Sequence, residues 1–173
     1  MTRSRRLTLA CGALAFAFFL FHDQLAAAVV TRGDDALRTG DVATAIRLYV
    51  RATQLDAGSS IAADRLAFHL ALQHDRSSAH IAIDVATRAL RAAPEPALFA
   101  DRAFAELQLH AWRRAERDFD RAGRLASDAR YEHYAARMAL RSGDRDAAKR
   151  YARLALADDP AFAPARALLR YLS

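Results

Sequence analysis

The chain has 173 residues, of which 53% are hydrophobic and 27% are charged, a balance that suits one ordinary globular domain and argues against a disordered chain. It contains 43 alanines but only 6 glycines and 4 prolines, so the composition favours helices and argues against a β-sandwich or a parallel sheet. The formal net charge is +6, and the single cysteine, Cys11, excludes an intramolecular disulfide, a cysteine redox pair and a multi-cysteine zinc site.

The first thirty residues have the pattern of a membrane-targeting segment. Three arginines, Arg3, Arg5 and Arg6, precede an uninterrupted apolar run over residues 7–21. A basic stretch followed by an apolar stretch is the arrangement of a secretory signal. Fifteen helical residues cover about 22 Å, which is less than the roughly 30 Å of a bilayer core.

This segment has two alternative fates, and both remain open. Residues 1–28 are either a signal peptide cleaved near Ala28 or a signal anchor whose helix continues over residues 7–30. Because the arginines favour the cytoplasmic side, we expect the rest of the chain to be exported. It would lie at the periplasmic face of a bacterial inner membrane, or in the soluble periplasm if the segment is cleaved.

The remainder of the chain contains an internal repeat. An alanine, an aromatic residue or alanine four positions later, and an alanine three positions after that occur together four times. The copies are Ala45, Tyr49 and Ala52; Ala82, Ala86 and Ala89; Ala115, Phe119 and Ala122; and Ala148, Ala152 and Ala155. Their first residues are 37, 33 and 33 positions apart, close to the period of a two-helix repeat. A small residue also recurs at the eighth position of each unit, as Gly33, Ala67, Ala103 and Ala136.

This pattern resembles the tetratricopeptide repeat, a helix-turn-helix unit of about 34 residues. The resemblance implies an all-α, right-handed superhelical solenoid of about four units plus a C-terminal capping helix, preceded by the N-terminal apolar helix. The expected limits are 29–173 for the domain, with units at about 26–59, 60–95, 96–128 and 129–162 and the capping helix at 162–173. Unit two has three extra residues, which we expect in its turn around residues 73–78.

No motif in the sequence indicates catalysis, a cofactor or a metal. Dinucleotide-binding, phosphate-binding, zinc-protease and serine-hydrolase signatures are all absent from the sequence. His74 and His80 are interpreted as solvated loop residues rather than metal ligands, and the acidic pairs 34–35 and 158–159 as residues of helix ends. We therefore expect a noncatalytic protein without a cofactor.

The resemblance also implies a ligand surface. In this family, extended peptides or partner helices lie in the concave groove made by the first helices of successive units. The corresponding positions here are Asp34, Leu37 and Arg38 in unit one, and Asp64, Phe68, Leu72, Phe104, Leu107, Gln108, His133, Arg137 and Arg141 in the later units. Phe68 and Phe104 would hold an apolar side chain while the arginines take a carboxylate. The alternative is that both phenylalanines are core residues between units.

A second candidate surface lies on the second helix of unit three. Arg113, Arg117, Arg121 and Arg124 share one helical face. The simpler interpretation is a solvated convex face that includes the pairs Arg114–Asp118 and Asp120–Arg124. The alternative is docking to an acidic partner or to anionic lipid headgroups. Export and the modest net charge argue against nucleic acid as a partner.

Two functions follow as alternatives. The first is a noncatalytic adaptor or scaffold of the bacterial cell envelope, which binds a peptide or helix of another protein in the groove. That protein would belong to a secretion, pilus, polysaccharide-export or cell-wall assembly. The second is a structural, membrane-proximal module that self-associates or docks through its convex arginine face.

Overall fold

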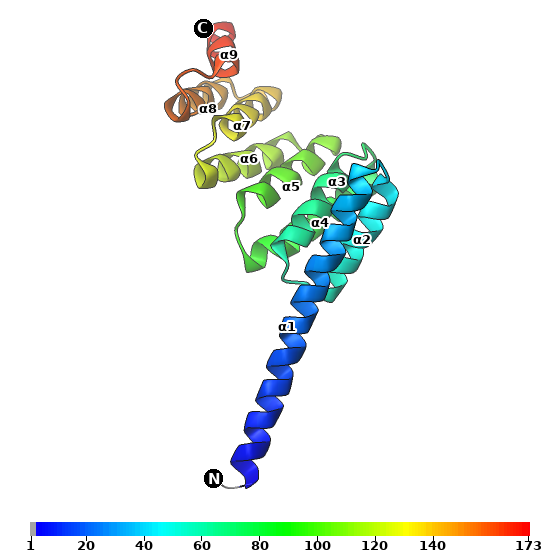
Figure 1. Ribbon diagram of the computed structural model, residues 1–173. Helices are drawn as coiled ribbons and strands as arrows, with labels where there is room; N and C mark the ends of the chain where they lie inside the picture. Colours follow the sequence, from blue (N-terminus) through cyan, green and yellow to red (C-terminus); the bar gives the residue numbers. More distant parts are fainter. Residues whose placement is uncertain (1–2) are drawn as a thin grey trace. The chain divides into compact units, whose positions relative to one another are not determined.

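The computed structural model describes the backbone of residues 3–173 and the side chains of residues 21–173. The described residues form nine α-helices and no strand, which confirms the all-α prediction (Figure 1). The helices are α1 (Arg3–Arg38), α2 (Val42–Leu55), α3 (Ser60–Ala71), α4 (Arg76–Ala92), α5 (Pro96–Gln108), α6 (Trp112–Ala126), α7 (Ala129–Arg141), α8 (Arg145–Asp158) and α9 (Ala163–Leu172). The chain divides into two compact units, Met1–Ala62 and Ala63–Ser173.

The predicted signal peptide or signal anchor falls mostly on residues 1–20, whose side chains lie outside the described part of the chain. The backbone of α1 is helical from Arg3 onwards. Within the described residues, no helix is both long enough and apolar enough to cross a bilayer. The fate of this segment and the location of the protein therefore stay predictions.

The first unit is built on a close crossing of α1 and α2. A Cβ atom added at Gly33 would lie 2.5 Å from Cε1 of Tyr49, so only glycine fits there. The Tyr49 ring is fully buried, and its hydroxyl donates a hydrogen bond of 2.6 Å to Oδ1 of Asp34. Glycine thus allows the aromatic residue of the repeat pattern to enter the space between the two helices.

In the second unit, each helix from α4 to α9 packs against the next one along the chain (Figure 1). The nine residues of the repeated alanine and aromatic pattern in this unit are buried, none more than 7% exposed, as are the three in the first unit. Ala67, Ala103 and Ala136, the small residues of the first helices, are fully buried. Small side chains let helix backbones approach closely, and the larger Phe119 fills the space that remains.

The turns inside the repeats share one backbone conformation. In each turn one residue has a positive φ: Gly40 at 82°, His74 at 54°, His110 at 56° and Gly143 at 89°. The residue that follows precedes the second helix, and in three repeats it is an aspartate. Asp41, Asp75 and Asp144 each accept a hydrogen bond from a backbone amide in the first turn, whereas Ala111 before α6 cannot.

The extra residues of unit two lie in its second helix rather than in its turn, where they were expected. The loop between α3 and α4 covers only residues 72–75, and α4 begins at Arg76. Instead, α4 has 17 residues, whereas α2, α6 and α8 have 14, 15 and 14. The prediction of a longer turn around residues 73–78 was therefore wrong, because Asp75 caps a helix that starts one turn earlier than the repeat pattern indicates.

The last helix, α9, occupies the range expected for a capping helix and packs on α8. Ala165 and Leu172 are buried on its inner side, and Leu172 packs against Ala139, Ala147 and Ala148. The outer side of α9 carries Arg166 and Arg170, both exposed. The helix therefore covers the apolar face of the last repeat and presents a polar face to water.

Candidate functional site

Side chains from the first helices of three successive repeats come together in the second unit. The ring of Phe104 on α5 lies edge-on to the ring of Tyr134 on α7, with centroids 5.4 Å apart. The carboxyls of Asp64 on α3 and Asp101 on α5 interact with one another and with Tyr131 on α7. We call this surface, formed by α3, α5 and α7, the first-helix face.

The apolar residues predicted for the groove fall into two groups. Phe68 on α3 is 41% exposed, and Leu72, the first residue after α3, is 51% exposed. Phe104 instead packs edge-on against Phe119, with centroids 5.1 Å apart, and Leu107 packs against the same core cluster. Phe68 and Leu72 are thus available to a partner, whereas Phe104 and Leu107 are engaged in packing between helices.

The polar residues predicted for the groove lie in different surroundings. Arg137 is exposed, Gln108 is half-buried, and Asp64 lies 3.3 Å from the guanidinium of its neighbour Arg65. The His133 ring packs edge-on against Phe162, with centroids 5.7 Å apart, and burial together with the charge of Arg137 lowers its pKa. His133 is therefore partly covered by the segment before α9.

The three groove positions predicted in unit one belong to the first compact unit. Asp34 accepts the hydrogen bond from the Tyr49 hydroxyl, and Arg38 forms an ion pair with Asp35. Leu37 is half-buried. Asp34 thus has a role in the packing of α1 on α2.

Sequence reasoning missed the aspartic acid at the centre of the first-helix face. Asp101 is 4% exposed, and its Oδ2 atom has no hydrogen-bond partner among the described residues. Burial raises the pKa of Asp101 to about 9, and the neighbouring carboxylate of Asp64 adds to the shift. Asp101 follows the buried Leu98 by three residues and precedes the buried Ala105 by four, a helical spacing that could have placed it on the buried face.

A buried ion pair joins three helices of the second unit. Arg102 on α5 donates two hydrogen bonds to Asp118 on α6, of 2.6 and 2.8 Å, and a third of 3.1 Å to Thr87 on α4. The predicted Arg114–Asp118 pair was therefore wrong, and Arg114 lies 3.3 Å from Glu106 instead. Asp118 follows Ala115 by three residues and precedes Ala122 by four, a spacing that could have placed it on the buried face.

Two glutamic acids are also buried in the second unit. Glu106 is 4% exposed and Glu132 is 3% exposed, and one oxygen of each has no partner among the described residues. Burial, with a smaller contribution from nearby carboxylates, raises the pKa of each to about 7. Glu132 lies against Gly123, where an added Cβ would be 2.6 Å from its Oε1 atom.

The four arginines of the predicted convex surface are all exposed along α6. Arg124 forms the predicted pair with Asp120, at 3.0 Å. Arg113 lies at the start of the helix and lines a pocket with Trp112. This surface is accessible, as both interpretations of the arginines require.

The histidines considered as metal ligands are exposed and lie in different elements. His74 has the positive φ of the turn, and His80 lies in α4 rather than in a loop. Within the described residues, no three histidine, cysteine or acidic side chains are grouped to hold a metal ion.

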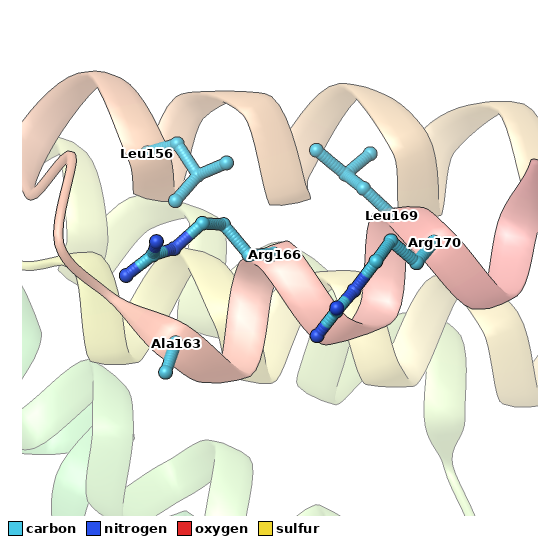
Figure 2. Close-up of a pocket in the computed structure, with 5 residues that line it drawn as sticks. All are labelled: Leu156, Ala163, Arg166, Leu169 and Arg170. Atoms are coloured by element: carbon cyan, nitrogen blue, oxygen red, sulfur yellow. The ribbon is translucent and has the colours of Figure 1, made fainter.

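A shallow pocket lies between α8 and the capping helix. Figure 2 shows Leu156 on α8 and Leu169 on α9 at its apolar floor, with Arg166 and Arg170 beside them. The Arg166 guanidinium donates a hydrogen bond of 2.7 Å to the backbone oxygen of Ala161. Arg166 is thus hydrogen-bonded to the segment before α9.

No family profile matches the sequence, and no curated protein matches it. The structure, in contrast, is similar to solved structures of helical repeat proteins. MamA has a TM-score of 0.71 and 18% identity, over 81% of this chain and 81% of that one. YrrB, a tetratricopeptide repeat (TPR) protein with an unusual peptide-binding site, has a TM-score of 0.67 and 18% identity, over 83% of this chain and 74% of that one. A TPR protein from Parabacteroides merdae has a TM-score of 0.68 and 15% identity, over 86% of this chain and 60% of that one. With its buried four-fold pattern and its helical pairs, the chain therefore has the tetratricopeptide repeat fold.

Proposed function

We propose that the protein is a noncatalytic scaffold of the bacterial cell envelope, and that it binds a segment of another protein on its first-helix face. The observation that carries the proposal is the exposure of Phe68 and Leu72 on this face of a TPR fold. The peptide-binding site of YrrB, which has the same fold, supports peptide binding as a use of this architecture.

The two exposed side chains are suited to anchor a partner. Phe68 lies in the last turn of α3 and Leu72 directly follows that helix. The Leu72 amide still donates a hydrogen bond of 3.2 Å to the backbone oxygen of Phe68, so the two side chains lie on the same side. Fully burying a Leu or Phe side chain contributes about 1.5–3 kcal/mol. Because both side chains are already about half covered, a partner that buries the rest would gain roughly 1.5–3 kcal/mol in total, out of about 8 kcal/mol for a micromolar complex.

The noncatalytic part of the proposal is supported by the surroundings of the acidic residues. Asp101, Glu106 and Glu132 have raised pKa values, as catalytic acids often have. They are however 3–4% exposed, so a substrate could not reach them without a rearrangement of the core. Envelope location is supported by the N-terminal sequence pattern.

Site-specific photocrosslinking in cells tests the proposal. A photoreactive phenylalanine analogue at position 68 should crosslink a specific partner, and the same analogue at Ile81, 48% exposed on α4, should not. In the full chain, the Phe68→Ser and Leu72→Ser double variant should lose that partner, whereas Ile81→Ser should keep it. Equal crosslinking from both positions, or retention by the folded double variant, would contradict binding on this face.

The exposed arginines of α6 favour docking through the convex face as a second candidate function. In that case the analogue should crosslink from position 121 and not from position 68. An Arg117→Gln and Arg121→Gln double variant should then release the protein from its acidic partner or from anionic vesicles.

A further inference from the structure

A pocket at the turn between α5 and α6 combines the single tryptophan of the chain with three arginines. It is lined by His110, Ala111, Trp112, Arg113, Arg114, Arg141 and Ser142. These residues come from the turn before α6, the start of α6, the end of α7 and the residue that follows α7. The helices α6 and α7 pack against each other. We call it the Trp112 pocket.

Aromatic contacts hold the pocket in a defined arrangement. The guanidinium carbon of Arg141 lies 4.9 Å from the centroid of the Trp112 ring, within the range of a cation–π interaction. On the same ring, His110 makes an edge contact, with centroids 5.2 Å apart. A guanidinium positioned in this way loses little further conformational freedom when it binds a ligand.

The lining of the pocket itself carries only positive charge. Arg113, Arg114 and Arg141 are exposed, and none of the seven lining residues is acidic. Arg113 and Ser142 also line an adjoining pocket that contains Asp144 and Asp146, whereas Arg141 is not among the residues that line it. The ion pair between Arg114 and Glu106, at 3.3 Å, engages one of the three guanidiniums. In the other three repeats an aspartate occupies the position of Ala111, so the equivalent turns carry a carboxylate of their own.

We infer that the Trp112 pocket binds an aspartate or glutamate side chain of an acidic segment of a partner protein. The planar guanidinium of Arg141 matches a planar carboxylate and can bind both of its oxygens, with Arg113 supplying a further cation. The Trp112 ring offers an apolar surface to the methylene groups of the same side chain. The inference rests on the proposed function only in taking the ligand to be a protein segment, because the pocket involves neither Phe68 nor Leu72.

The tryptophan provides the measurement. Since Trp112 is the only tryptophan, its fluorescence reports on this pocket in the full chain. Titration with a hexaglutamate peptide should change the emission in a saturable way, and hexaglutamine or inorganic phosphate at equal ionic strength should not. Anisotropy of a dye-labelled hexaglutamate gives the affinity independently of the tryptophan.

Variants separate the pocket from general attraction to a basic surface. Arg141→Gln should weaken hexaglutamate binding on the order of 10-fold, as the loss of a charge-assisted hydrogen bond of about 1.4 kcal/mol predicts. Ala111→Asp, which places a carboxylate in the pocket, should weaken it at least as much while circular dichroism shows an intact fold. Arg117→Gln with Arg121→Gln, on the exposed side of the same helix, should leave it nearly unchanged.

Three results would overturn the inference. One is equal weakening by the Arg117 and Arg121 variant, which would make the attraction nonspecific. Another is saturation by phosphate as readily as by hexaglutamate, which would make the ligand a phosphate rather than a carboxylate. The third is no response to either probe. The Phe68→Ser and Leu72→Ser variant should respond as the wild type does, so failure of the first-helix face leaves this test unaffected.

Discussion

Asp101, Glu106 and Glu132 are carboxylic acids enclosed in the second unit of the structure. Each is at most 4% exposed and has an oxygen without a partner among the described residues. A buried carboxylate without enough donors is unfavourable, so these groups hold a proton at pH values where an exposed carboxyl has lost it. Their pKa values rise from ordinary values of 3.8 or 4.5 to about 9 for Asp101 and about 7 for the glutamic acids.

We expect the free energy of unfolding to fall as the pH rises from about 5 to about 9. The folded chain binds more protons than the unfolded chain over this range, so the slope of stability against pH is negative. The stability from Glu106 and Glu132 is lost progressively as the pH rises from about 4.5 to about 7, and that from Asp101 as it rises from about 4 to about 9. Urea midpoints measured at pH 5, 7 and 9 check the trend.

The variant Glu132→Gln should reduce the decrease in the free energy of unfolding between pH 5 and 7. It should leave the decrease between pH 7 and 9 unchanged. Glutamine has the same shape and cannot ionise. Glu95→Gln, at an exposed position before α5, is the control and should leave the pH profile unchanged. A profile that rises towards pH 9 would contradict burial of these acids in their neutral form.

These buried acids are the residues that sequence reasoning identified least well. Periodicity assigns alanine and phenylalanine to the core, and it did so correctly for Ala115, Phe119 and Ala122. It treats charged residues as surface residues. The spacing of Asp118 could have placed it on the buried face, but its partner Arg102 lies sixteen residues earlier on another helix, and a local pattern does not identify that partner.

At the scale of the helices, close approach at small residues determines the packing. Gly33 contacts the ring of Tyr49, and Gly123 contacts the carboxyl of Glu132. In both places the space of a missing Cβ is filled by a side chain from the neighbouring helix. The sequence indicated the first contact, because Gly33 occupies the small-residue position of the repeat.

Gly33→Ala should lower the free energy of unfolding by about 1–2 kcal/mol. Overpacking against the Tyr49 ring costs about 1–3 kcal/mol, and the higher helix propensity of alanine returns about 0.5–1 kcal/mol. Urea denaturation followed by circular dichroism measures the difference. Gly58→Ala, in the loop after α2, is the matched control and should change stability by less than Gly33→Ala. A stabilised Gly33→Ala variant would show that the crossing of α1 and α2 is looser than described.

Arg102→Met should destabilise the protein by about 3 kcal/mol. It leaves Asp118, whose side chain is 11% exposed, without its guanidinium. The double variant Arg102→Met and Asp118→Leu should recover a large part of the loss, because no buried charge remains. Thermal or urea unfolding of the single and double variants measures how much stability is recovered. A double variant as unstable as Arg102→Met would show that the loss of stability does not come from the unpaired charge of Asp118.

The lengths of the helices were predicted less well than their existence. The repeat pattern located α4 through Ala82, Ala86 and Ala89, all buried as expected. It could not locate the start of that helix, because core spacing carries no information about exposed residues in the first turn. The signal was present in Asp75 and Ser78, whose capping hydrogen bond of 2.8 Å resembles those after Gly40 and Gly143.

At the scale of the whole molecule, each helix from α4 to α9 packs mainly against its neighbours in sequence. A repeat array of this kind loses stability locally rather than uniformly. The α9 end depends on few contacts, with Leu172 and Ala165 as its buried residues.

Leu172→Ala should therefore open α8 and α9 while leaving α5 and α6 protected. Truncation of a buried leucine costs about 2–5 kcal/mol, and Leu172 is 1% exposed. Hydrogen exchange resolved by peptide should show faster exchange in the last two helices alone. Tyr171→Ala, at a residue that is 70% exposed, should leave exchange unchanged. Faster exchange throughout the second unit would contradict local unfolding.

The enclosed acids also make folding a proton-consuming reaction. Near pH 7 the folded chain takes up protons from the solvent, on the order of one at Asp101 and a fraction of one at each of Glu106 and Glu132. Those protons come from the buffer, so the heat measured on unfolding includes the ionisation heat of the buffer. Calorimetry in phosphate and in Tris should give different unfolding enthalpies at the same pH. The difference should be proportional to the number of protons released on unfolding.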